Sequence, residues 1–153
     1  MSLSRMAPVP CFVKGVFVIV SPSGTVPVVI LTDGTDRVLP IFVGLWEAVS
    51  INSAKNKEVL PRPFTHDLFL ETFIKFGITL KSLQIDAMQD GVYYAQLILS
   101  GDHNEVRVDC RPSDGIALAL RGDAPIYVEQ HVLDDAGQVE GELPLMRDIS
   151  EFL

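Results

Sequence analysis

The sequence contains few of the features that would assign a chain to a familiar class. Its two cysteines, Cys11 and Cys110, belong to no CxxC motif and have no histidine at a ligand spacing. This argues against a structural zinc and favours buried thiols in a reducing compartment. No apolar run reaches the roughly 18 residues of a membrane-spanning helix, and the N-terminal stretch lacks the basic start and small-residue cleavage site of a signal peptide. We therefore expect a cytoplasmic protein that does not contact membranes.

Common motifs of nucleotide-binding proteins and hydrolases are also missing. The chain has no GxxxxGK(S/T), GxGxxG, HExxH or GxSxG segment. It therefore shows no sign of a P-loop, a dinucleotide site, a zinc-protease site or a nucleophile elbow. We expect no organic cofactor.

Basic residues are scarce. The chain has 12 Lys and Arg against 20 Asp and Glu, a net charge of -8. Much of the excess lies in residues 133–153, which carry six acids against Arg147. Non-specific binding of nucleic acid needs clustered basic residues, and only the stretch 52–66 is mildly basic, with three basic residues against Glu58. The charge pattern leans against nucleic acid without excluding it.

The chain does have ample material for a core, because 48% of its 153 residues are hydrophobic. Val- and Ile-rich or alternating segments predict strands over 12–20, 26–31, 37–43, 79–86, 92–99, 105–110 and 125–128. Helical periodicity and end signals predict helices over 45–56, 65–76, 113–121 and 130–136. We predict one α+β domain over 6–137, with two antiparallel β sections packed with three or four helices. Residues 138–153 form an acidic tail, either a docked amphipathic helix or a segment that binds a protein partner.

Two similar segments couple an Arg-Pro pair to an aspartate at the start of a predicted helix. They are Arg-Pro-Phe-Thr-His-Asp at 62–67 and Arg-Pro-Ser-Asp at 111–114, and their similarity hints at an internal duplication. One interpretation is helix initiation, with Thr65 and Ser113 as N-caps. Asp67 and Asp114 would then lie in the first turns, where the helix dipole favours negative charge. Taken alone, this interpretation is favoured.

The alternative is a functional site. Arg111 and Asp114 stand at the start of an otherwise apolar helix, so they should lie at the edge of the core, where charges pair or bind a ligand. Asp109 should face the same side of its strand as Arg111. The group is as compatible with a buried ion-pair network as with a ligand site.

Several segments in a fixed order resemble the bifunctional nuclease domain family, long catalogued as a domain of unknown function. They are PVVIL (27–31), VLPIFVG (38–44), EA (47–48), RP (62–63), THDL (65–68), DGVYYA (90–95), VD (108–109), RPSD (111–114), IALALR (116–121) and APIYV (124–128). The resemblance runs from about residue 12 to residue 137. It implies an α+β domain, commonly a homo-oligomer, with nuclease activity on RNA and DNA. Gly115 stands where we expect Ala, which predicts a looser helix start, and the acidic tail would repel a polyanion.

This resemblance yields candidate roles. DNA has no 2′-hydroxyl, so cutting both nucleic acids requires an activated water, which carboxylate-bound Mg²⁺ or Mn²⁺ could supply. His66 would act as general base or acid. The candidate residues are, for catalysis, His66, Asp67 and Asp114; for substrate binding, Arg62, Arg111 and Ser113; for the metal, Glu47, Asp67, Asp109 and Asp114. RNA or DNA would be the substrate and a homodimer the favoured assembly.

The competing hypothesis is a non-enzymatic module that binds a protein or an anionic ligand. In that case the Arg-Pro motifs only fix two helices and the ion pairs are structural. Convergence of His66 with Asp109 and Asp114 would favour the nuclease. Mutual saturation of Arg111 and Asp114 would favour the binding module.

Overall fold

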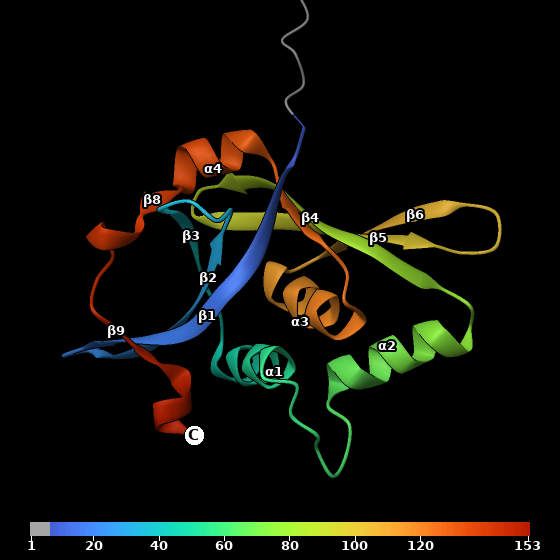
Figure 1. The fold of residues 1–153 in the computed structure, drawn as a ribbon, viewed down its shortest axis with the longest axis horizontal. Coiled ribbons are helices and arrows are strands. Elements are labelled where there is room, and N and C mark those ends of the chain that lie inside the picture. The colour runs from blue at the N-terminus through green and yellow to red at the C-terminus, as the bar shows by residue number, and fades with distance from the viewer. Residues whose placement is uncertain (1–6) are drawn as a thin grey trace, which may run out of the picture.

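The computed structural model describes residues 7–153, so Met6, where the predicted domain begins, lies outside the described part. Within that part the chain forms a single α+β domain, as predicted, in which four α-helices accompany one mixed sheet of nine strands (Figure 1). The strands are β1 (Val9–Ser21), β2 (Gly24–Thr32), β3 (Arg37–Phe42), β4 (Thr79–Gln89), β5 (Val92–Ser100), β6 (Glu105–Cys110), β7 (Ile126–Val128), β8 (Gln138–Val139) and β9 (Met146–Asp148). The helices are α1 (Leu45–Lys55), α2 (Thr65–Lys75), α3 (Pro112–Gly122) and α4 (Gln130–Ala136).

The two predicted β sections are both present and belong to one sheet. β1, β2 and β3 form one antiparallel meander, and β4, β5 and β6 form the other. The short strand β7 lies between them, parallel to β4 and antiparallel to β1. The sheet order is therefore β6-β5-β4-β7-β1-β2-β3-β8, with β9 paired to β1. The first meander leads into α1 and the second into α3. The internal duplication stays a prediction.

Helix α3 is the centre of the packing. It contacts α1, α2, β4 and β5, and its Ile-Ala-Leu-Ala run at 116–119 is almost completely buried, as its apolar composition predicts. Gly115 lies where this helix approaches the sheet closely, and the looser helix start stays a prediction. A methyl group there would collide with Leu83 of β4 and press on Cys110, so the missing side chain lets α3 approach the sheet closely.

The helix starts correct two predicted caps. Thr65 and Ser113 are not N-caps, because the cap positions are taken by Phe64 and Arg111, and neither of these side chains forms a capping hydrogen bond with a backbone N–H of its helix. α3 instead begins with Pro112, whose missing N–H costs nothing at the first helical position. As a consequence, Asp67 and Asp114 both stand at the third position of their helices.

The acidic tail is docked on the sheet, although not as an amphipathic α-helix. β8 pairs with β3 and β9 pairs with β1, and single 3-10 turns follow at η1 (Glu140–Glu142) and η2 (Ile149–Phe152). Ile149 is fully buried, and Glu140 pairs with Lys14 of β1. Gly141 and Pro144 explain the difference, since both interrupt a continuous helix. From residue 7 onwards, no helix is long and apolar enough to cross a membrane.

Candidate functional site

The two Arg-Pro motifs meet in space. His66 lies in the first turn of α2 and Asp114 in the first turn of α3, and both helices pack together. The Nε2 atom of His66 lies 2.9 Å from Oδ1 of Asp114, although the two residues are 48 positions apart in the sequence. This hydrogen bond joins the histidine of one predicted motif to the aspartate of the other.

The second ring nitrogen of His66 is engaged as well. Nδ1 lies 2.7 Å from the hydroxyl oxygen of Ser50 on α1. A neutral imidazole that donates its Nε2–H to Asp114 must accept at Nδ1, so Ser50 would donate its hydroxyl proton to His66. The result is a continuous chain of hydrogen bonds, Ser50–His66–Asp114, drawn from three helices.

Arg111 connects this chain to a second carboxylate. Its Nε and Nη2 donate to Asp114 at 2.9 and 3.2 Å, and its Nη1 donates to Glu47 of α1 at 3.1 Å. Burial alone would raise the pKa of Asp114, but the hydrogen bonds and charges of Arg111 and His66 outweigh it and hold that pKa below its ordinary value. The bond to Asp114, followed by that to Glu47, raises the pKa of Arg111. Asp114 is therefore an anion at neutral pH.

These groups line a groove of about 530 Å³. Its wall contains, besides Glu47, Ser50, His66, Arg111 and Asp114, the residues Trp46, Val49, Pro63, Phe64 and Thr65. The guanidinium of Arg111 is accessible, since its side chain is 64% exposed. A groove of this volume is in the usual range for a small-molecule site.

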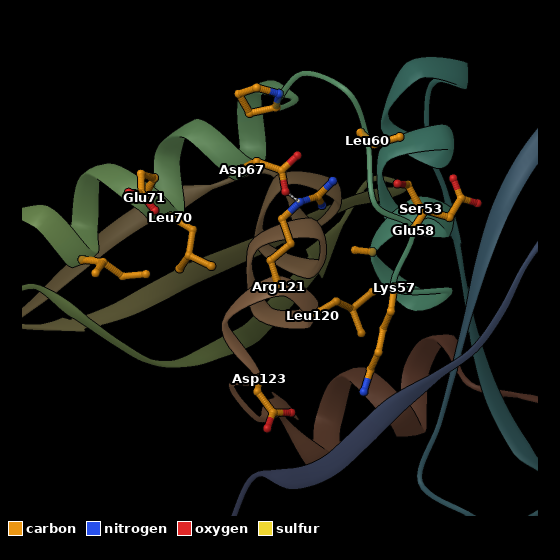
Figure 2. Close-up of a pocket in the computed structure, with 13 residues that line it drawn as sticks. Ser53, Lys57, Glu58, Leu60, Asp67, Leu70, Glu71, Leu120, Arg121 and Asp123 are labelled. Carbon is orange, nitrogen blue, oxygen red and sulfur yellow. Dashed lines mark hydrogen bonds and ion pairs between the residues drawn. The ribbon is translucent and has the colours of Figure 1, made fainter.

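Asp67 faces away from this groove, into a second cavity of about 690 Å³ (Figure 2). There its Oδ1 accepts from Nε of Arg121 at 2.7 Å, and its Oδ2 accepts from the backbone N–H of Phe64 at 2.8 Å. Arg121 also donates to the carbonyl of Ala117 and is only 7% exposed. Burial alone would raise the pKa of Asp67, but these bonds lower it overall. The pair fastens the start of α2 to the end of α3.

The other candidates are not part of the groove. Asp109 on β6 and Arg62 before α2 are exposed, and neither forms a hydrogen bond or ion pair with the side chains of residues 7–153. Ser113 is buried and lines a different depression beside Pro112. Among the described residues, no three His, Cys, Asp or Glu side chains are gathered so as to hold a metal ion. The structure therefore does not assemble Glu47, Asp67, Asp109 and Asp114 into one ligand set.

Ser50 and Arg121 are the important residues that the motifs did not single out. Ser50 had a signal in the sequence, because it lies three residues after Glu47 on the polar face of its helix. Arg121 closes the IALALR segment at the end of the buried helix, but nothing in the sequence showed that it pairs with Asp67. Cys11 is buried, as predicted, whereas Cys110 is only partly buried. The pKa of both Cys11 and Cys110 is raised to about 11, mainly because the thiols are removed from water.

Comparison with known proteins supports the resemblance seen in the motifs. A profile described as "Bifunctional nuclease domain" matches residues 28–141. An uncharacterised protein of Mycobacterium tuberculosis is 44% identical over 112 residues, which cover 72% of this chain and 66% of that protein. Bifunctional nuclease 1 of Arabidopsis thaliana is 32% identical over 105 residues, covering 67% of this chain and 32% of the plant protein. The chain thus spans just under two thirds of the mycobacterial relative and about a third of the plant one.

Proposed function

The chain belongs to the bifunctional nuclease domain family, and from this premise we propose that it hydrolyses phosphodiester bonds of RNA and DNA in the groove around His66. The observation that carries the proposal is the 2.9 Å hydrogen bond between His66 and Asp114. It gives an imidazole a carboxylate partner, which is the arrangement that general acid–base catalysis uses.

The hydrogen-bond chain supports a path for the proton. Both ring nitrogens of His66 are engaged, so we propose that a proton reaches the ring through Ser50. A water attacks phosphorus and gives one proton to the Ser50 hydroxyl, while the original Ser50 proton moves to Nδ1. Asp114 stabilises the resulting imidazolium through Nε2–H. The bond from phosphorus to the leaving oxygen breaks, and that oxygen takes a proton from solvent. The imidazolium of His66 then releases its extra proton to solvent, which restores the neutral ring.

Arg111 would hold the phosphate in this scheme. Its guanidinium is exposed and carries five N–H donors in a planar fork, which suits two oxygens of one phosphate. To reach the phosphate it must release part of its contact with Glu47 or Asp114. Positive charge beside the phosphate would stabilise the transition state.

A divalent metal does not fit the groove as it stands. Glu47 and Asp114 are the carboxylates that line it, and Arg111 bridges them at 2.9–3.2 Å. A metal between them would have to displace the guanidinium, which is a like charge. We therefore expect cleavage to persist in EDTA. Cleavage that requires Mg²⁺ or Mn²⁺ would mean that the metal takes the place of Arg111.

Cleavage of single-stranded RNA and DNA by the purified protein tests the proposal. His66→Ala should reduce kcat by about 100-fold or more, because it removes the acid–base group, and Ser50→Ala should reduce kcat by about 10-fold with little change in KM. His103→Ala and Ser53→Ala are matched controls. His103 lies in an exposed turn and Ser53 lines the other cavity, so neither should alter the rate. Folded His66→Ala protein that cuts as fast as the wild type would refute the proposal.

A second candidate function is a non-enzymatic module for an anionic ligand or a protein. The saturation of Arg111 by Glu47 and Asp114 favours it, because such a network can be purely structural. Wild-type protein that cuts neither RNA nor DNA would leave this candidate in place.

A homodimer is our proposal for the assembly. It is supported by α2, none of whose residues is buried although Leu68, Phe69 and Ile74 are apolar and exposed. A molar mass twice that of the chain in light scattering would agree with it. A cytoplasmic location and a protein partner for residues 138–153 stay predictions.

A further inference from the structure

Two aromatic side chains on the groove have no role in the proton path. Trp46, the one tryptophan of the chain, is 78% exposed. Phe64 is also exposed, and both line the groove that contains His66 and Arg111. Large apolar side chains left in water at a concave site are typical of a binding surface.

The charges of the groove restrict what this surface can bind. Arg111 is neutralised by Glu47 and Asp114, and the chain as a whole carries a net charge of -8. The groove therefore cannot hold a nucleic acid mainly by neutralising phosphates, which requires an excess of basic side chains. Affinity for a polynucleotide must come largely from another source, and stacking of bases on aromatic rings is that source in proteins that bind single strands.

We propose that the groove selects unpaired nucleotides, with bases stacking on Trp46 and Phe64. This inference rests on the proposed nuclease function and names its substrate class, single-stranded nucleic acid rather than duplex. In a duplex the faces of the bases are covered by their neighbours, whereas an unpaired base can be splayed out onto a ring.

The sequence positions of the two rings support this choice. Trp46 precedes Glu47 in the first turn of α1, and Phe64 stands two residues before His66 at the cap of α2. Both rings line the same groove as the polar side chains of the site. A base stacked on either ring would have its own phosphate in the groove that contains Arg111 and the Ser50–His66–Asp114 chain.

The fluorescence of Trp46 tests the proposal directly, since no other tryptophan contributes. The full chain would be titrated with a short phosphorothioate oligothymidylate, with the same strand annealed to its complement, and with an abasic strand of equal phosphate count. We expect the single strand to quench the emission. The duplex and the abasic strand should bind at least about 10-fold more weakly, because neither offers a free base to the rings. Equal affinity for the abasic strand would overturn the proposal.

Substitutions distinguish base stacking at the groove from binding to any exposed apolar side chain. By anisotropy of a labelled strand, Trp46→Ala should raise Kd about 5- to 100-fold, and Phe64→Ala should act in the same direction. Trp46→Phe, which keeps a ring, should stay within about 3-fold of the wild type. The matched control is Phe76→Ala, since Phe76 is also 78% exposed but does not line the groove. Phe76→Ala should leave Kd unchanged, and an equal loss with this variant would contradict stacking at the groove.

Two further outcomes keep this inference distinct from the nuclease proposal. Quenching by the single strand without any cleavage of ordinary oligonucleotides would refute the nuclease and leave the stacking site intact. Cleavage of duplex and single strand at equal rates, with Trp46→Ala fully active, would keep the nuclease and refute the stacking site. Trp46 emission that changes with protein concentration alone, and a lower molar mass for Trp46→Ala, would instead assign this surface to a second copy of the chain.

Discussion

Asp67 and Asp114 occupy equivalent local positions but have different hydrogen-bond partners. Both follow an Arg-Pro pair, both stand at the third position of an α-helix, and both have a pKa below the ordinary value. Asp67 accepts from a nearly buried arginine and a backbone N–H. Asp114 accepts from an accessible arginine and from a histidine whose other nitrogen bonds to a hydroxyl.

The difference lies in the partners and not in the aspartates. The Arg121 side chain ends inside the protein, so the pair with Asp67 holds two helices together. The groups around Asp114 line an open groove and can exchange partners with a ligand. A lowered carboxylate pKa therefore does not by itself identify a catalytic residue. What distinguishes Asp114 from Asp67 is its hydrogen bond to His66, which lines the same groove.

Substituting the two aspartates one at a time should have its largest effect on the rate of cleavage. Asp114→Asn should lower kcat by about 100- to 10,000-fold, because His66 loses the charge that stabilises its protonated form. Asp67→Asn should keep kcat within a few-fold of the wild type, since its carboxylate faces the other cavity. Steady-state cleavage, corrected for the folded fraction by circular dichroism, measures both. Equal losses of kcat in the two variants would show that Asp114 has no role in cleavage that Asp67 lacks.

For the free energy of unfolding we expect the reverse order, with a larger loss in Asp67→Asn than in Asp114→Asn. Both losses should be smaller than the effect of Asp114→Asn on kcat. Breaking a fully buried ion pair costs about 3–5 kcal/mol, and the Asp67 side chain is 36% exposed, so we expect Asp67→Asn to lose about 2 kcal/mol of unfolding free energy. Asp114→Asn should lose less than about 1 kcal/mol, because the accessible Arg111 can turn to water. Urea unfolding of the two variants measures both values. A double-mutant cycle with Arg121→Met should recover most of the Asp67 loss as coupling energy.

The smallest effect is the pH dependence of that stability. A pKa lowered by folding stabilises the native state above the unfolded-state pKa, and this contribution disappears as pH falls through the folded-state pKa. The difference in unfolding free energy between wild type and Asp67→Asn should thus be constant above about pH 5. It should shrink below the ordinary value of 3.8. A difference that grows on acidification would show that Asp67 is not stabilised as an anion.

The secondary structure could be predicted because it follows from local pattern. Alternating and Val-rich segments predicted the strands of both meanders. The turn residues between these segments placed the predicted strand ends within a few residues of the observed ends of β1 to β6. The apolar 116–119 run identified the buried helix. Joining the meanders into one sheet could not be predicted, because it depends on three residues, Ile126–Val128, that pair with segments far away in the chain.

Part of the candidate site could also be predicted from local sequence pattern. His66, Arg111, Asp114 and Glu47 do converge, since the motifs mark the helix starts that meet there. The separation of Asp67 from this group is decided by Arg121, which belongs to the far end of another helix. Sequence spacing places a side chain on a helix, but the rotation of that helix against its neighbours decides which cavity the side chain enters.

The position of β7 has a consequence for how the chain acquires its structure. Until residues 126–128 are in place, β1 and β4 each lack the neighbour that joins the two meanders. The contacts that β7 makes with Val9–Cys11 span most of the chain, and such distant contacts slow folding. During synthesis the first meander and α1 emerge long before their link to the second, with strand edges open to pairing with other chains. Pairing of this three-residue strand is thus required before the two meanders form one sheet.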